Sequence, residues 1–342
     1  MNKDNKNQEI LEQMIESATM EGLTVSQGNV LHEYEPYCFS SHIDENQTTM
    51  HLYCWLDSDS ANRYANILLI IGDSEDLGMN ISDLMEIADD TNGHLSLYHL
   101  APCPDCGSLQ LRAGLIISGK DLPRSKFRWL LQSMIEEGKH IRSYLNQCMS
   151  ETADCHQEDS QEDSPDECFD AYPHRIESLK EIADVLGRLK LPVANDFRKD
   201  GDIYFDVSYQ SYPDLMIRVG IRIEKNPDRV VFVMASPNDI VPDDQASQVL
   251  ELTCRINKCA VVDHVYIHPV TRRPIVQKGI LMTAGILDSN EVESAVRTIL
   301  GNGSFYLRMI REQISSHDRP EDVFRRMYGK EFPTRIESKC YH

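Results

Sequence analysis

The chain has 342 residues, of which 41% are hydrophobic and 26% are charged, and its formal net charge is −21. This length accommodates roughly two domains, and the composition is that of a globular protein, which excludes fibrous, collagen-like and low-complexity classes. Residues 1–150 carry 22 acidic and 10 basic side chains. Residues 151–170 carry nine acidic side chains and no basic ones, and residues 171–342 carry 24 acidic and 24 basic side chains. The two acidic stretches would repel phosphate polymers, so no nucleic acid is expected as a partner.

The start of the chain, MNKDNKNQEI, is polar, and apolar runs such as residues 67–71 are much shorter than the ~20 residues that span a bilayer. Ten cysteines are scattered without a compact framework, which favours reduced thiols in a reducing compartment. These features predict an unprocessed cytoplasmic protein that has no membrane segment and no membrane partner.

The first half shows a regular succession of helical and strand patterns. Apolar residues recur at helical spacing, then alternate with polar ones, then form the unbroken run NILLIIG, which is typical of a strand in the middle of a sheet. In chain order we predict a helix over 8–20, strands over 50–56 and 66–72, a helix over 80–93, a hairpin from 95–98 and 109–117, and a long helix from Pro123.

An acidic segment, ETADCHQEDSQEDSPDECFD, follows at residues 151–170 and contains almost no aliphatic side chains. Such a segment cannot bury enough apolar surface to offset the entropy of ordering it. We therefore predict a flexible acidic linker over residues 151–172, which separates a domain at 1–150 from a second domain at 173–320 that is followed by a C-terminal tail at 321–342.

The second half repeats the succession of the first. Its predicted elements are a helix over 175–191, strands over 203–207, 215–221 and 229–235, a helix over 243–258, a hairpin from 261–267 and 275–282, and a final helix from Asn290.

Particular residues also recur at a constant offset of 165. Gly114 matches Gly279, and Gly138 in the final helix of the first half matches Gly303 in that of the second. Because glycine inside a helix costs about 1 kcal/mol relative to alanine, a bend or a close helix contact is expected at both positions. The sequence therefore predicts an α+β fold made of two tandem α-β-β-β-α-β-β-α domains, each with an antiparallel sheet packed with helices.

This element order, together with features such as GILMTAGILDSNEVESAV at residues 279–296, resembles the YbjN-type branch of the type III secretion chaperone-like (Tir chaperone-like) fold, once in each half. The resemblance implies small acidic bacterial domains that pair with each other and present apolar grooves and sheet edges to extended peptide segments. For the YbjN-type branch, the resemblance implies a regulatory protein. Two copies on one chain would replace a homodimer by an internal pseudodimer.

Motifs for catalysis are missing from the sequence. It contains no GxxxxGK[ST] phosphate loop, no GxGxxG after a strand, no HExxH and no GxSxG. We therefore expect that the protein is not an enzyme and needs no cofactor.

The turn APCPDCGS holds Cys103 and Cys106, and His99 lies four residues upstream of the first thiol. Two thiolates at this spacing can chelate zinc, but a closed tetrahedral site needs two further ligands, for which His99, His94 and Cys54 are candidates. The pair could instead cycle as a dithiol, although such motifs usually stand at the start of a helix. The third interpretation is that they are ordinary turn residues, as in the matching turn HPVTRRPIV, which has no cysteine.

An aromatic face is predicted on the strand over residues 50–56. If its apolar alternate residues point to the core, then His51, Tyr53 and Trp55 line the opposite face, where exposed aromatic side chains are good anchors for a protein partner. The alternative is that the other half or a loop covers this face. The residues on the matching face of the second half are Met216, Arg218, Gly220 and Arg222.

Together these observations predict a non-enzymatic protein-binding protein, chaperone-like or regulatory, that recognises a protein or peptide segment. The alternative function is a metal-linked or redox regulator that uses Cys103 and Cys106. The two halves are expected to pack against each other as the internal pseudodimer.

Overall fold

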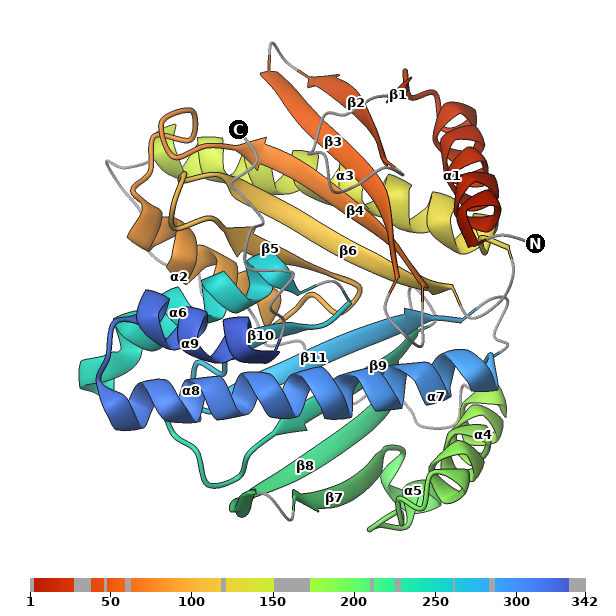
Figure 1. Ribbon diagram of the computed structural model, residues 1–342, viewed down its shortest axis with the longest axis vertical. Coiled ribbons are helices and arrows are strands. Elements are labelled where there is room, and N and C mark those ends of the chain that lie inside the picture. Colours follow the sequence, from red (N-terminus) through yellow and green to blue (C-terminus); the bar gives the residue numbers. More distant parts are fainter. Residues whose placement is uncertain are drawn as a thin grey trace.

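The computed structural model describes residues 3–27, 38–45, 48–58, 63–117, 121–150, 173–209, 212–224, 229–260, 262–282 and 287–331. Within these ranges the chain forms two α+β domains, each built on an antiparallel sheet with packed helices (Figure 1). The predicted linker over residues 151–172 lies outside the described residues. None of the helices in these ranges combines the length and the apolar character needed to cross a bilayer.

The first domain has the predicted order of long elements. Its sheet has the strand order β1-β2-β3-β4-β6-β5, and every neighbouring pair is antiparallel. The elements are α1 (Lys3–Met20), β1 (Ser26–Gln27), β2 (Cys38–Glu45), β3 (Thr48–Ser58), β4 (Arg63–Gly72), α2 (Ile81–Asn92), β5 (Tyr98–Pro102), β6 (Leu109–Ile117) and α3 (Arg124–Ser150).

The second domain repeats this order with additional short elements. Its antiparallel sheet has the order β10-β11-β9-β8-β7. The elements are α4 (Pro173–Arg188), α5 (Phe197–Asp200), β7 (Ile203–Tyr209), β8 (Tyr212–Glu224), β9 (Arg229–Ala235), the 3₁₀ turn η2 (Asp243–Gln245), α6 (Ala246–Cys259), β10 (His264–Ile267), β11 (Pro274–Leu281), α7 (Ser289–Thr298), the π-helical turn η3 (Ile299–Gly303), α8 (Ser304–Ser316) and α9 (Pro320–Glu331).

The predicted C-terminal tail at 321–342 needs correction. Residues 320–331 form α9, which packs on α6 and α8, and its Val323 and Tyr328 are buried in the core of the second domain. These two side chains remove apolar area from water, so the packed part of this domain continues past residue 320.

The strand patterns of the sequence are reproduced in the sheets. Met50, Leu52 and Cys54 of β3 point into the core of the first domain, as their alternation predicts. The unbroken apolar runs form β4 and β9, which lie in the middle of their sheets. Each sheet therefore has its most hydrophobic strand where neighbours cover it on both edges.

The repeated glycines allow helices to approach the sheets closely. A Cβ atom at Gly138 would lie 2.4 Å from Cδ2 of Leu69 on β4, and one at Gly303 would lie 2.4 Å from Sδ of Met234 on β9. The predicted close contact is confirmed at both positions. The two domains nevertheless differ here, because α3 is continuous over 27 residues whereas the second domain inserts η3 between α7 and α8.

Substitution of this glycine is expected to be costly. Gly138→Ala should lower the free energy of unfolding by about 1–3 kcal/mol, because the new methyl group must displace a packed core side chain. Gly187→Ala on α4 is the matched control, since no atom lies within 4 Å of its added Cβ and alanine favours the helix. Urea denaturation followed by circular dichroism checks this, and equal effects of both substitutions would contradict the close contact.

The two domains lie against each other (Figure 1). Helix α2 and strand β5 of the first domain contact α6 and β10 of the second. A Cβ atom at Gly279 on β11 would lie 2.5 Å from the backbone oxygen of Ser96, so glycine permits the close approach of the two backbones at this junction.

Candidate functional site

A hydrogen-bond pattern at the end of α2 is repeated at the end of α6. The Asn92 side chain donates to the carbonyl oxygen of Leu100 at 2.9 Å and accepts from the Leu100 amide at 2.7 Å. Asn257 makes the same two bonds with Val265, at 2.8 and 2.7 Å. Each asparagine thus ties the end of a helix to the strand that follows it, and the two pairs differ by the offset of 165.

Two histidines join these motifs across the junction between the domains. His99 Nε2 lies 2.9 Å from the carbonyl oxygen of Asn257, and His264 Nε2 lies 3.1 Å from that of Asn92. Because a carbonyl oxygen only accepts, each Nε2 carries the proton. The rings stack with centroids 5.4 Å apart, and burial lowers the pKa of both, that of His264 to about 4. Neutral rings are therefore the stable form at neutral pH.

His99 is consequently not placed as a zinc ligand beside the two cysteines. Among the residues that the structure describes, no group of three or more histidine, cysteine, aspartate or glutamate side chains is arranged to hold a metal ion. The ligand set considered from the sequence, Cys103 and Cys106 with His99, is not brought together, because His99 turns into the domain junction instead.

Cys103 and Cys106 lie in the turn between β5 and β6, as predicted. The Cys103 amide donates to the carbonyl oxygen of Ser108 at 2.8 Å, and the Gly107 amide donates to that of Cys103 at 2.8 Å. The turn at residues 268–273 has the same two bonds, at 2.9 and 2.8 Å. A residue with positive φ closes each turn, and in the first turn it is Gly107 at φ 73°.

At the first position of each turn, the sulfur of Cys103 in the first turn corresponds to a ring nitrogen of His268 in the second. There, His268 Nδ1 accepts hydrogen bonds of 3.2 Å from the amides of Val270 and Thr271. In the first turn, Cys103 holds the matching position and its sulfur accepts from the amide of Cys106. The turn geometry therefore points backbone donors at an acceptor, which favours a negative charge on Cys103.

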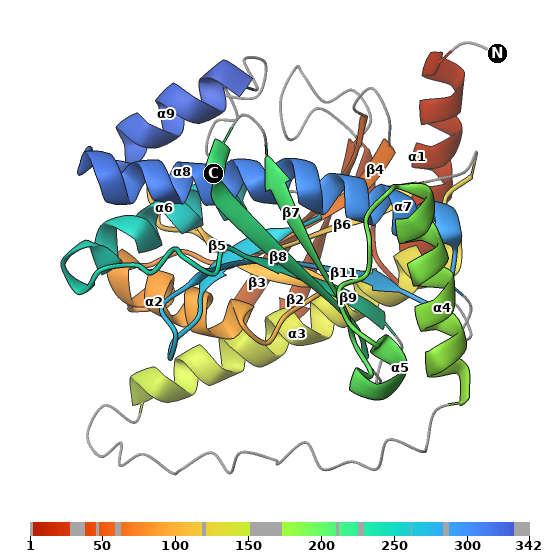
Figure 2. The same cartoon turned by 90° about the horizontal axis from the view of Figure 1, so that it is seen from below.

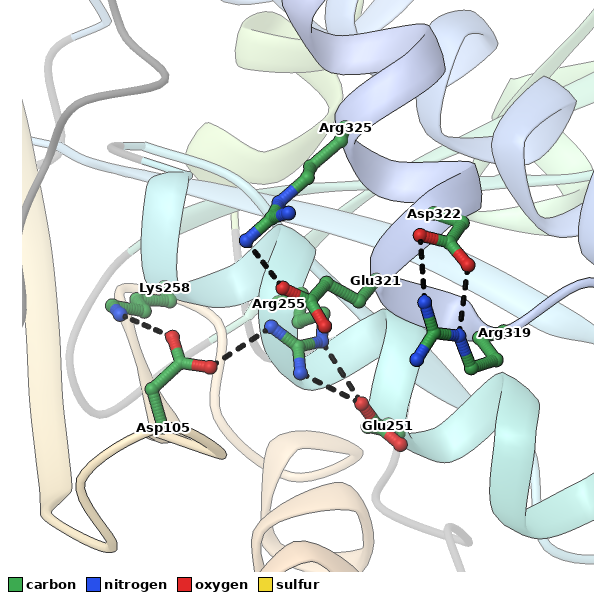
Figure 3. A network of polar contacts seen from close by, with 8 residues as sticks. All are labelled: Asp105, Glu251, Arg255, Lys258, Arg319, Glu321, Asp322 and Arg325. Carbon is green, nitrogen blue, oxygen red and sulfur yellow. Dashed lines mark hydrogen bonds and ion pairs between the residues drawn. The ribbon is translucent and has the colours of Figure 1, made fainter.

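Charged residues of α6 hold this turn against the second domain (Figure 3). The Asp105 carboxylate lies 3.1 Å from the Arg255 guanidinium and 3.2 Å from the Lys258 ammonium. Arg255 also pairs with Glu251 on its own helix at 2.8 Å. The pair Glu321–Arg325 drawn beside it belongs to α9, and the pair Arg319–Asp322 joins the residue before α9 to its first turn.

The second turn has no equivalent of Asp105. Val270 occupies the matching position and is 83% exposed. The positions of the first domain that match Arg255 and Lys258 hold Asp90 and Gly93. The charge contact is therefore specific to the turn that contains the two cysteines.

The two thiols have different protonation preferences. The Cys106 thiol hydrogen-bonds to the Cys103 sulfur and, together with the Lys258 ammonium, lowers the pKa of Cys103 from 9.0 to about 5, although burial acts in the opposite direction. The same bond to Cys103 raises the pKa of Cys106. The hydrogen bond and the Lys258 ammonium therefore favour the negative charge of the pair on Cys103 and the proton on Cys106.

The predicted aromatic face is covered in the first domain. Tyr53 and Trp55 point away from the core, as the alternation predicts, but they are only 9% and 8% exposed and pack with Cys38 and Leu68. His51, the third candidate, is half-buried and its Nδ1 lies 3.1 Å from that of His42. As they stand, the two large aromatic side chains do not form surface anchors.

The matching face of the second domain is open. Tyr204 and Met216 are 38% and 43% exposed, and Arg218 pairs with Asp206 at 2.8 Å on the exposed surface between them. Figure 2 shows β7 and β8 at the near surface of the molecule, in front of α8. The same sheet face is thus closed in one domain and open in the other.

A buried group of charges also lies between the domains. Lys126 on α3 forms an ion pair with Glu291 on α7, and these two residues again differ by 165 positions. Lys278 is buried nearby, and in the described part of the chain its Nζ has no hydrogen-bond partner. It borders a cavity of about 20 Å³, which has room for one water molecule. We assign this group to the packing of the domains.

Comparison of the chain with protein-family models, with curated proteins and with solved structures found no match. The class of protein is therefore defined by the fold and the junction described above: an α+β protein with two domains of repeated element order.

Proposed function

We propose that this protein is a non-enzymatic, chaperone-like or regulatory protein that binds an extended segment of another protein on the sheet of its second domain. The observation that carries the proposal is the open outer face of β7 and β8, whose counterpart in the first domain is covered. The resemblance to the YbjN-type and type III secretion chaperone-like fold supports the same function. In this proposal the two domains act as an internal pseudodimer in the bacterial cytoplasm.

The outer edge of β7 beyond Tyr204 suits an extended segment. Among the described residues β7 pairs with β8 alone, and at its start the amide and carbonyl of Tyr204 bond to Asn195 and Ala194 at 2.8 and 2.7 Å. Main-chain groups alternate in direction along a strand, so those of Asp206 and Ser208 also point away from β8. A partner strand can add there through main-chain bonds, and its alternate side chains then lie on the same face of the sheet as Tyr204 and Met216.

The metal-linked alternative has no third ligand among the described residues. Its redox form has a specific observation in its favour, the hydrogen-bonded thiol pair of Cys103 and Cys106, which lies at a site separate from the open face of β7 and β8.

The proposal is tested with three forms of the purified protein. Met216→Asp places a charge on the open face, and Ile240→Asp places the same charge on a loop whose isoleucine is 56% exposed. Each form is used to capture partners from native lysate. Proteins that wild type and Ile240→Asp retain, but Met216→Asp does not, are purified, and the Kd of each for the three forms is measured. We expect Met216→Asp to weaken binding by about tenfold or more, since burying a charge costs at least ~1.4 kcal/mol.

Two results would contradict this proposal. One is that no protein distinguishes Met216→Asp from the other two forms. The other is that a purified partner binds all three with the same Kd, which would place its site on another surface.

A further inference from the structure

We propose that Cys103 and Cys106 form a reversible redox pair, oxidised to an intramolecular disulfide by small-molecule disulfides, in which Cys106 reacts first and Cys103, held by Lys258 of the other domain, completes the bond. This inference concerns a site separate from the open face of β7 and β8, and it does not depend on the proposed function.

The placement of the two sulfurs assigns their roles. The Cys103 side chain is fully buried, whereas Cys106 is partly exposed. The sulfurs are hydrogen-bonded to each other, and Cys106 Sγ also lies 3.2 Å from Ser108 Oγ. An external reagent therefore meets Cys106, and a bond formed there lies directly against Cys103.

Lys258 provides the second, independent observation. It is only 9% exposed, and it contacts both the Cys103 sulfur and the Asp105 carboxylate. A buried ammonium is costly unless it is paired, and a thiolate supplies the second negative partner. In the repeat, where the turn has no cysteines, the position that matches Lys258 holds Gly93. The buried cation of α6 thus lies against the turn that contains the thiols, and the repeat has no matching cation.

The reaction balances as two successive thiol–disulfide exchanges. In the first, the proton shared by the pair passes to Cys103, and Cys106 Sγ attacks one sulfur of the small disulfide, whose S–S bond breaks and releases a thiolate. In the second, Cys103 gives its proton to that thiolate and attacks Cys106 Sγ, which breaks the mixed disulfide and releases the second thiolate. Two electrons pass from the two cysteine sulfurs to the small disulfide, which is reduced to one thiol and one thiolate.

Oxidation removes the negative charge that Lys258 faces at Cys103 and leaves the lysine with Asp105. Lys258 therefore stabilises the reduced form more than the oxidised form. Because the lysine belongs to α6 and the cysteines to the β5–β6 turn, the redox state is linked to the contact between the domains.

The first experiment assigns the order of attack with isosteric serine variants. The full-length protein is treated with oxidised glutathione and analysed by peptide mass spectrometry. Wild type should yield the 103–106 disulfide, reversed by dithiothreitol. Cys103→Ser should accumulate a mixed disulfide on Cys106, because no second thiol resolves it, and Cys106→Ser should form no adduct on the buried Cys103. A wild type that stops at a mixed disulfide, or a Cys106→Ser protein that reacts at Cys103, would overturn the assignment.

The second experiment tests Lys258 against the exposed Lys180 of α4 as a matched control. Glutathione redox buffers give the equilibrium constant for the 103–106 disulfide, and absorbance at 240 nm gives the thiolate titration, with Cys103→Ser as the blank. Lys258→Met should shift the equilibrium about tenfold towards the disulfide, the effect of one pKa unit, and should raise the pH at which the thiolate forms. Lys180→Met should change neither. If Lys258→Met folds with both values of wild type, Lys258 has no part in the pair.

Discussion

Asn257→Ala is expected to lower the free energy of unfolding by about 2–5 kcal/mol, one of the largest effects of any single polar substitution in this protein. The asparagine is buried, and its side chain satisfies both the amide and the carbonyl of Val265. Alanine would leave two buried main-chain groups without partners, each costing about 1–3 kcal/mol. Asn92→Ala should have a similar effect, because Asn92 makes the same two bonds with Leu100.

Urea denaturation at neutral pH measures these losses. Asn290→Ala, at an exposed position near the start of α7, is the matched control and should change stability by less than about 0.5 kcal/mol. A loss at Asn92 or Asn257 no larger than that of the control would show that the repeated motif does not hold the helix ends to the strands.

Acid is expected to weaken the domain junction through His99 and His264. Burial holds the pKa of His264 at about 4, below its ordinary 6.5, and that of His99 well below 6.5. The unfolded chain therefore binds protons first as the pH falls. The stability contributed by the neutral rings is complete above pH 6.5 and declines as the pH falls further, and for His264 the decline ends at about pH 4. For His264 alone the loss amounts to roughly 3 kcal/mol.

The measurement must separate this effect from that of Asp89, whose carboxylate accepts from the Ile267 amide. Burial raises the pKa of Asp89 to about 7, so Asp89 contributes in the opposite direction as the pH falls. The double variant His99→Gln, His264→Gln keeps a donor near each carbonyl but cannot titrate. The free energy of unfolding at pH 4.5 minus that at pH 7.5 should be more negative in wild type than in this variant, which keeps Asp89 but lacks both histidines. Equal differences would exclude the histidines as the acid-sensitive groups.

Cys103 and Cys106 illustrate why their role could not be assigned from the sequence. The spacing of Cys103 and Cys106 correctly places both in one turn, but it left zinc binding, dithiol chemistry and plain turn residues as alternatives. Lys258 is 155 residues from Cys103, and no local pattern connects them. By contrast, the offset of 165 also relates Asn92 to Asn257 and His99 to His264. This second set of matches is a signal in the sequence for the residues that meet at the junction between the domains.

The sequence was sufficient for most of the order of helices and strands, β2 and α9 excepted, for the core face of β3 and for the close contacts at Gly138 and Gly303. These features follow from hydrophobic periodicity and from backbone sterics, which act over a few residues of chain. Whether a face is covered depends instead on segments distant in the sequence. Alternation correctly placed Tyr53 and Trp55 opposite the core, but only the tertiary structure shows that they are buried while Tyr204 and Met216 remain exposed.

The same physical reason explains the other differences. The apolar side chains of α9 find their partners on α6 and α8, so a segment expected to be a tail becomes part of the core. His99 bonds to a carbonyl 158 residues away instead of joining the cysteines, and the Asp105 carboxylate meets two cations of the other domain. Burial, charge pairing and the protonation of Cys103 depend on such contacts between distant segments. They are therefore set by the packing of the two domains and cannot be read from local sequence patterns.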